Sequence, residues 1–195
     1  ELASTANQDS LEFRLKLMGE DKIPQGNGPI KFSNARLKNV LKIAAKNANW
    51  GKSLPKGHAY GLAVQYSFLS YVASVVEVSL VEEMVKIHNV YTVIDCGKVV
   101  NKDTVLAQMQ GAAIFGMSLA LYGKITAKEG AIEQSNFGYD RLVRMNEAPN
   151  IHVEIVESNE PPTGVGEPGV PVIAPAIVNA IYKLTGKRYH NLPLS

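Results

Sequence analysis

The chain has 195 residues and a formal net charge of +2, with 46% hydrophobic and 19% charged residues. This balance is that of an ordinary globular core, and the length predicts one compact unit over residues 1–195. Basic residues form no cluster with aromatic ones and the longest apolar runs are short, which argues against a nucleic-acid partner and a membrane span. The single cysteine, Cys96, excludes an internal disulfide and a multi-cysteine zinc site.

The first part of the chain is predicted to be helical. It begins ELASTANQDS, without a methionine or a signal-peptide pattern, so we expect a piece of a longer polypeptide. A short helix is predicted at 10–18, followed by a loop rich in glycine and proline at 19–32. A longer helix is predicted at 34–49, with Ser33 or Asn34 as its N-cap.

A β-rich stretch and a long helix follow. Segments 57–68, 71–81 and 85–95 are rich in Val, Tyr and Ile, which predicts antiparallel strands. Asn101 or Asp103 can cap a helix of roughly five turns. Tight packing of its small residues Gly111, Ala112, Ala113 and Gly116 on a sheet is the preferred interpretation, and close approach of a cofactor backbone is the alternative. The face in question comprises Val105, Met109, Ala112, Ala113, Gly116 and Ala120.

The last third of the chain predicts three more elements. A hairpin is expected over 124–137, and the alternating segment 151–157 predicts a strand with one solvated face. A helix is predicted from Pro175 to Thr185, with Pro175 in the first helical position and Gly186 as its stop. Together these elements predict an α+β fold in which helices pack on antiparallel or mixed sheets.

The stretch PPTGVGEPGVP, residues 161–171, has the glycine spacing of a dinucleotide-binding loop, with Gly164, Gly166 and Gly169 in the three positions. Such a loop leaves a strand directly and opens a helix. A second strand then supplies an acidic residue about 20 positions further on. Here that position is Tyr189, close to the last residue of the sequence. The spacing therefore gives little support to a dinucleotide site.

The same stretch presents Glu167 between Gly166 and Pro168. Glycines allow a ligand to approach the backbone, and prolines restrict the chain around the carboxylate. One interpretation is an acid that complements the dipole of the following helix. The other is a general base whose pKa is set by burial. The residues alone leave both open.

Other reactive side chains carry weaker signals. The four histidines lack metal-ligand spacing, so no metal ligand is predicted in this chain. Cys96 is expected to be a packed thiol. Arg141 and Arg144 are expected to form surface ion pairs rather than an anion site.

Three long segments resemble a known family. They are YTVIDCGKVVNKDTVLAQMQGAAIFGMSLALYGKI, SNFGYDRLVRMNEAPNIHVEIVES and PPTGVGEPGVPVIAPAIVNAIYKLTGKR. They resemble the molybdenum-binding subunit of the xanthine dehydrogenase and aldehyde oxidase family, and above all its isoquinoline-oxidising branch. The resemblance covers essentially the whole chain. It implies the C-terminal part of a molybdopterin-binding subunit several times longer.

The resemblance assigns roles to a few positions. Glu167, in GVGEPG, matches the catalytic glutamate of the family. Gln108, in AQMQG, matches a glutamine that reaches the pterin of the cofactor, and Gly166 would also lie against the cofactor. Phe68, in GLAVQYSFLS, matches an aromatic wall over the substrate ring, with Val64 expected on the same strand face.

The resemblance also implies an activity. The full-length enzyme would hydroxylate an N-heteroaromatic such as isoquinoline, with water as the oxygen source and Glu167 as the base that accepts a proton. The alternatives are an aldehyde-oxidising member of the same family or, for the isolated chain, a structural or assembly module without chemistry.

The implied cofactor is molybdopterin with molybdenum, as the cytosine dinucleotide, in the full-length enzyme, with none expected in the isolated chain. Iron–sulfur clusters would lie on a small [2Fe-2S] partner subunit, and the upstream part of the polypeptide would complete the cofactor site. The compartment stays open between the bacterial cytoplasm and periplasm.

Overall fold

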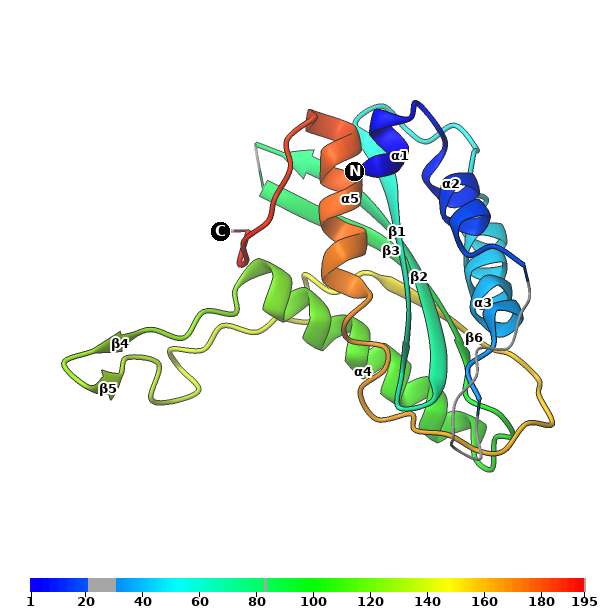
Figure 1. Ribbon diagram of the computed structural model, residues 1–195. Helices are drawn as coiled ribbons and strands as arrows, with labels where there is room; N and C mark the ends of the chain where they lie inside the picture. The colour runs from blue at the N-terminus through cyan, green and yellow to red at the C-terminus, as the bar shows by residue number, and fades with distance from the viewer. Residues whose placement is uncertain (21–30, 83, 195) are drawn as a thin grey trace.

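The computed structural model describes residues 1–20, 31–82 and 84–194, and a four-stranded sheet forms its centre (Figure 1). The strands are β1 (His58–Ser67), β2 (Ser70–Val81), β3 (Met84–Asp95) and β6 (Asn150–Ile155), in the order β1-β2-β3-β6. The first three pair antiparallel, as predicted, and β6 runs parallel to β3. The sheet is therefore mixed. Most of the loop predicted at 19–32 lies outside the described residues.

Five helices are present among the described residues: α1 (Leu2–Thr5), α2 (Ser10–Leu17), α3 (Asn34–Asn47), α4 (Lys102–Leu121) and α5 (Ile173–Thr185). Side-chain caps explain where the two longest helices, α3 and α4, begin. Ser33 accepts from the backbone N–H of Arg36 at 3.3 Å, and Asn101 accepts from Thr104 at 3.0 Å. These two residues are therefore the caps of α3 and α4.

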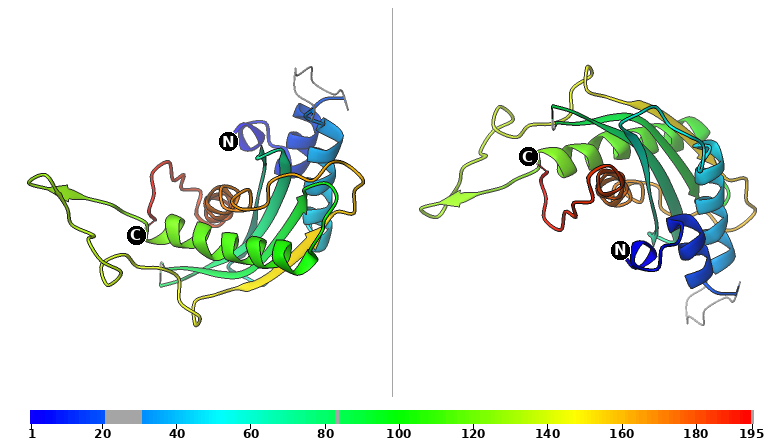
Figure 2. Two further views of the ribbon diagram at one scale, coloured as in Figure 1. Left: turned by 90° about the horizontal axis from the view of Figure 1, so that it is seen from below. Right: turned by 90° about the horizontal axis from the view of Figure 1, so that it is seen from above.

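The helices cover the two faces of the sheet separately (Figure 2). On one face, α3 buries Val40, Leu41 and Ala44 against alternate residues of β1, β2 and β3. On the other face, α4 and α5 pack together against the sheet. This second layer carries the site described below.

Close packing in this second layer depends on small residues. A Cβ on Gly61 of β1 would lie 1.9 Å from the carbonyl oxygen of Ala176 in α5. A Cβ on Gly116 of α4 would lie 2.8 Å from a side-chain carbon of Ile173. All six residues predicted to share one face of α4 are buried. The packing interpretation of that face is therefore confirmed.

The start of α5 differs from the prediction. The helix begins at Ile173, with Val172 in the N-cap position, so Pro175 is the third helical residue and not the first. Proline is tolerated there because the first backbone N–H groups of a helix have no intrahelical acceptor. The predicted stop is confirmed, since Gly186 is left-handed with φ 72°.

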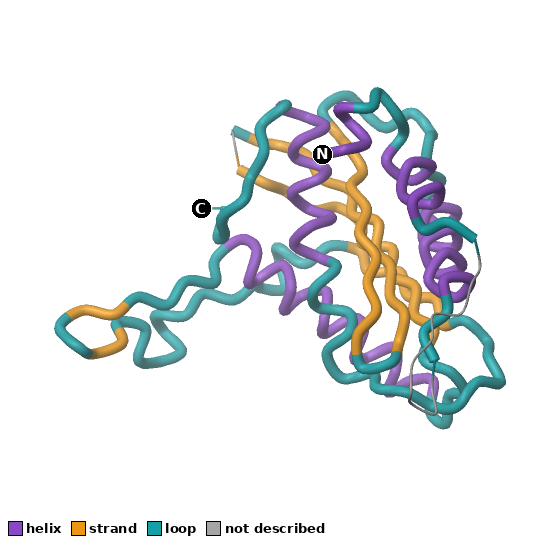
Figure 3. Tube along the Cα trace, viewed as in Figure 1, coloured by secondary structure: helices purple, strands orange, loops and turns teal. Residues whose placement is uncertain are grey.

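Between α4 and β6 the chain forms an extended arm that is mostly loop (Figure 3). The arm ends in the predicted hairpin of β4 (Ala127–Lys128) and β5 (Ala131–Ile132), which projects away from the sheet (Figure 1). Glu129 and Gly130 form its turn, both with positive φ.

Helix α4 has an unusual composition. Among the described residues it is the one helix whose 20 residues are long and apolar enough to cross a bilayer. The short apolar runs of the sequence did not predict such a helix. Half of the apolar stretch of α4 is buried inside the domain, where the helix packs on α5 and β6. In this structure α4 is a core helix.

Candidate functional site

The glycine loop crosses the end of the sheet at which β1 turns into β2. Its backbone is bonded to the residue that follows β3 and to the β1–β2 turn. The N–H of Thr163 donates to the carbonyl of Cys96 at 2.9 Å, and the N–H of Gly164 donates to the carbonyl of Phe68 at 3.0 Å. The loop then turns toward α5, with the N–H of Val170 donating to the carbonyl of Glu167 at 2.9 Å. It therefore passes between the β1–β2 turn and α4.

The three glycines of the loop have different structural roles. A Cβ on Gly164 would lie 2.8 Å from the Cβ of Phe68, and one on Gly169 would lie 2.8 Å from a side-chain carbon of α4. Both glycines permit close packing of the loop. The nearest atom to a Cβ on Gly166 would be Nε2 of Gln108, at 4.0 Å. This middle glycine therefore leaves space beside an amide side chain.

Glu167 and Gln108 are both exposed and both lack partners. Among the described residues, neither side chain makes a hydrogen bond or an ion pair. Glu167 directly follows Gly166, so the carboxylate and the amide belong to adjoining segments. A carboxylate can accept a proton, and an amide can both donate and accept hydrogen bonds. A ligand bound beside the loop could therefore use both the carboxylate and the amide.

Phe68 lies in the β1–β2 turn and is 59% exposed. Ser67 pairs with Ser70, so Phe68 and Leu69 form a two-residue turn with φ values of 50° and 64°. Two-residue hairpin turns with positive φ ordinarily use Asn or Gly, since left-handed backbone is unfavourable for larger residues. A bulky aromatic at this position marks a strained turn beside the loop.

Val64 does not lie beside the glycine loop. It lies within β1, half-buried, in the cluster that packs under α3. Phe68 lies beyond the end of β1, so strand alternation does not put the two side chains on one face. The expectation that Phe68 and Val64 share one strand face is therefore wrong. Phe68 adjoins the glycine loop, and Val64 belongs to the core under α3.

A buried ion pair supports the start of the loop. Arg36 of α3 binds Asp95 at the end of β3 through two hydrogen bonds, of 2.8 and 2.6 Å. Asp95 also accepts from the N–H of Gly97 at 3.2 Å. Gly97 has φ 72°, and a Cβ there would lie 2.1 Å from the carbonyl oxygen of Pro161. The hydrogen bond to Asp95 raises the pKa of the Arg36 guanidinium, so Arg36 stays charged.

The remaining reactive residues have structural surroundings. Cys96 is buried, and burial raises the pKa of its thiol, which suits the expected packed thiol. The ion pair expected for Arg141 is confirmed, to Glu147 at 2.7 Å, whereas the side chain of Arg144 forms no ion pair among the described residues. In the part of the chain that the structure describes, no group of three or more His, Cys, Asp or Glu residues could hold a metal ion.

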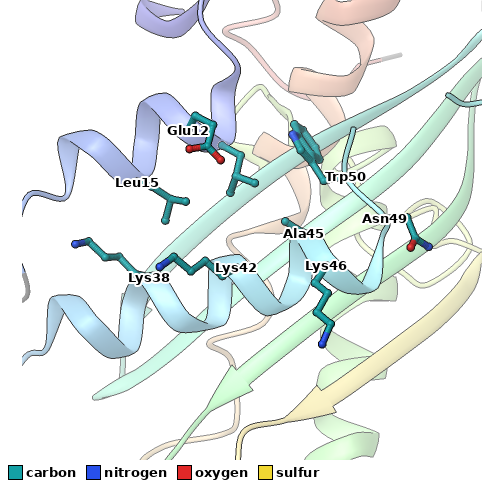
Figure 4. Close-up of a pocket in the computed structure, with 9 residues that line it drawn as sticks. Glu12, Leu15, Lys38, Lys42, Ala45, Lys46, Asn49 and Trp50 are labelled. Carbon is teal, nitrogen blue, oxygen red and sulfur yellow. The ribbon is translucent and has the colours of Figure 1, made fainter. Parts of the chain in front are cut away.

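A separate groove lies between α2 and α3 (Figure 4). Leu15 of α2 and Ala45 of α3 form part of its wall, and Lys42 points toward α2 while Lys46 points away. No residue of the glycine loop or of α4 lines this groove. It is a different feature from the candidate site.

The family described as the molybdopterin cofactor-binding domain matches residues 18–149. The matched part includes Phe68 and Gln108 and ends before the glycine loop.

Several relatives align with the whole chain, and two of them are more than 30% identical to it. The beta subunit of isoquinoline 1-oxidoreductase from Brevundimonas diminuta is 32% identical, and this chain covers 24% of it. A membrane-bound aldehyde dehydrogenase (pyrroloquinoline-quinone) from Gluconacetobacter polyoxogenes is 31% identical, and this chain covers 26% of it. The chain thus spans about a quarter of the length of these relatives.

Among solved structures, the aldehyde oxidoreductase of Desulfovibrio desulfuricans superposes with a TM-score of 0.56 at 26% identity. The match covers 64% of this chain and 14% of that protein. It supports the α+β fold.

Proposed function

The chain belongs to the molybdopterin cofactor-binding domain family, and from this premise we propose that it supplies the base and part of the cofactor contact of a molybdenum hydroxylase. The full-length enzyme would hydroxylate an N-heteroaromatic such as isoquinoline, with water as the oxygen source. Glu167 would be the general base, and Gln108 and Gly166 would contact the cofactor. Phe68 would flank the substrate ring.

One observation supports this proposal more than any other. The single loop 163–170 adjoins Phe68 through Gly164 and Gln108 through Gly166, while carrying Glu167 between them and α5. These residues come from segments about 40 to 100 positions apart. Glu167 and Gln108 have no side-chain partner among the described residues. The arrangement leaves a carboxylate and an amide free on one edge of the domain.

The residues present suit a pterin cofactor. Its polar ring edges need side chains that donate and accept hydrogen bonds, and the amide of Gln108 does both. Gly166 has no side chain to obstruct a ligand beside that amide. When bound, the molybdenum cofactor supplies the redox chemistry and the protein supplies orientation and the base.

The chain's own part in the reaction is proton transfer and positioning. The carboxylate oxygen of Glu167 would accept the proton released as an oxygen nucleophile attacks the electron-poor substrate carbon. The exposed ring of Phe68 would hold a planar substrate by stacking. The proposed partners are the rest of the polypeptide, which would complete the cofactor site, and a small [2Fe-2S] subunit that would accept the electrons. The cytosine dinucleotide form of molybdopterin belongs to the same proposal.

Aldehyde oxidation is the second candidate. One relative that aligns with the whole chain is named an aldehyde dehydrogenase, and the solved structure cited above is an aldehyde oxidoreductase. An aldehyde carbon is also electron-poor, so the same base would serve. Substrate choice would then depend on Phe68 and on the residues of the full-length subunit that complete the substrate site.

The test uses the full-length subunit with its electron-accepting partner. Glu167→Gln should lower turnover by about 10²- to 10⁴-fold, the usual contribution of a general base, with molybdenum content unchanged. Glu160→Gln is the matched control, because Glu160 is an exposed acid three residues before this loop. Turnover of Glu167→Gln near that of the control would refute the base assignment. Rates with isoquinoline and with benzaldehyde decide between the two substrate classes.

For the 195-residue chain alone, we propose a structural or assembly role without bound cofactor or turnover. Purified chain should contain no molybdenum by elemental analysis and should oxidise neither probe. Molybdenum together with substrate oxidation in this chain would contradict that proposal.

A further inference from the structure

We propose that Ser70 is a positioning residue for Glu167; this inference rests on the proposed function, because it takes Glu167 as the base. Ser70 is the first residue of β2 and is fully buried. Its hydroxyl oxygen lies 2.7 Å from the hydroxyl of Thr163 and 2.6 Å from the carbonyl oxygen of Gly164. A hydroxyl has one proton. Ser70 therefore donates to Gly164 and accepts from Thr163.

A second side chain of the same hairpin holds the other flank of Glu167. Nε2 of Gln65 in β1 donates to the carbonyl oxygen of Pro168 at 3.2 Å and to the hydroxyl of Ser67 at 2.8 Å. Ser70 and Gln65 thus fix backbone carbonyls on either side of Glu167, whose own side chain has no partner in the described part of the chain. A base held by its backbone keeps both carboxylate oxygens free for a proton.

The hairpin also couples the base to Phe68. Gly164 donates through its N–H to the carbonyl of Phe68 and accepts through its carbonyl from Ser70. The turn that carries Phe68 and Leu69 has positive φ at both residues, a conformation that persists only where surrounding contacts impose it. Loss of the Ser70 hydroxyl removes one of those contacts. The loop that carries Glu167 and the turn would then both gain freedom.

Ser74 provides a matched control on the same strand. It is also fully buried, and its hydroxyl lies 2.8 Å from the hydroxyl of Thr92, which makes the same kind of pair. It has no hydrogen bond to the glycine loop. Replacing either serine by alanine should cost similar stability, and only the Ser70 change should affect the loop.

The experiment compares Ser70→Ala, Ser74→Ala, Thr163→Val and Thr163→Ser in the full-length enzyme with its electron-accepting partner. The probe is whichever of isoquinoline and benzaldehyde the wild type oxidises. Ser70→Ala and Thr163→Val should lower kcat by about 10- to 100-fold, since misplacing a reacting group by about 1 Å has an effect of this size. KM and molybdenum content should stay within about twofold. Thr163→Ser keeps the hydroxyl, so it should retain near-wild-type kcat.

The outcomes separate the inference from the proposed function. If Glu167→Gln turns over normally, the proposed function fails and the positioning role fails with it. If Glu167→Gln is inactive but Ser70→Ala matches Ser74→Ala in kcat, the positioning role alone is overturned. Should Ser70→Ala not yield soluble enzyme, Thr163→Val decides the same question, with Thr163→Ser as its control.

Discussion

The base loop, residues 163–170, and a polar cluster near the start of β1 use their acids in opposite ways. The cluster, which we call the Glu77 cluster, comprises His58, Glu77, Ser79, His88 and Asn89. In it, Glu77 is 7% exposed and both of its carboxylate oxygens are engaged, by His58 at 2.7 Å and by Asn89 at 2.6 Å. In the base loop, Glu167 is exposed and its side chain has no partner among the described residues.

The difference teaches how to distinguish a structural acid from a reactive one. An acid whose oxygens both accept hydrogen bonds contributes to the stability of the sheet, and neither of its oxygens is without a partner. An acid with a free side chain on a firmly held backbone contributes little to stability and is available for proton transfer. Polar residues in a buried sheet are therefore poor indicators of catalysis when they are fully satisfied.

Among the changes that test this difference, the largest effect is expected from a substitution in the Glu77 cluster. Glu77→Ala removes both acceptors and leaves His58 and Asn89 without their partner, at a cost of about 1–3 kcal/mol in the free energy of unfolding. That equals roughly a 5- to 150-fold change in the folding equilibrium. Urea unfolding measures it. In the full-length enzyme, turnover per molybdenum should not change; a loss of turnover as large as that of Glu167→Gln would erase the distinction.

A smaller effect is expected at the cofactor contact. Gln108→Ala removes one ligand hydrogen bond, worth about 0.5–1.5 kcal/mol, so cofactor occupancy at limiting cofactor should fall about 2- to 10-fold. Thermal stability should hold, because the Gln108 amide has no protein partner among the described residues. Gln110→Ala is the control, being exposed and two residues away on α4. Equal molybdenum content in the two variants would argue against the contact.

At the aromatic wall the expected effect is smaller still. Phe68→Ala should raise KM about two- to fivefold, the value of one aromatic stacking contact of about 0.5–1 kcal/mol. Molybdenum content should stay constant, because the ring is 59% exposed and the backbone bond to Gly164 remains. Steady-state kinetics and elemental analysis measure the two quantities. A fall in metal content with an unchanged KM would make Phe68 a structural residue.

The smallest expected effect is a pH dependence of stability in the Glu77 cluster. Burial pushes the pKa of Glu77 up, but hydrogen bonds from His58 and Asn89 outweigh it and hold the pKa below its usual value. A lowered pKa in the folded state adds stability above the unfolded-state pKa, and this stability is lost as the pH falls through the folded-state value.

Between pH 6 and pH 3, the melting temperature of the wild type should therefore fall by about 2 °C more than that of Glu77→Gln, which has no titrating group there. An equal fall in melting temperature for the two proteins over this pH range would show that Glu77 does not contribute to acid sensitivity.

Much of the fold follows from local patterns. The caps Ser33 and Asn101, the three antiparallel strands and the hairpin at Glu129 are confirmed because each depends on neighbouring residues. The parallel pairing of β6 with β3 was not predicted, since it joins segments about 60 positions apart. The start of α5 was misplaced by two residues, because proline suits several positions of a first turn.

The residues of the candidate site also fall into those that the sequence indicates and those that only the folded chain shows. Glu167, Gln108 and Phe68 were nominated through family resemblance, and their roles stay proposals. The residues that hold the loop, Ser70 and Gln65, carry no local signal: a serine at a strand start and a glutamine within a strand are common. Their partners lie about 90 to 100 positions away, so only the folded chain reveals them.

The left-handed turn at Phe68 has a consequence for changing substrate range. Its carbonyl, and not its ring, forms the bond to Gly164. The ring can therefore be exchanged for another side chain while the backbone that carries the base stays anchored. Lengthening or shortening the turn would instead break that bond. A mutant library that varies the identity of residue 68 at constant turn length should thus explore new substrates with little loss of rate.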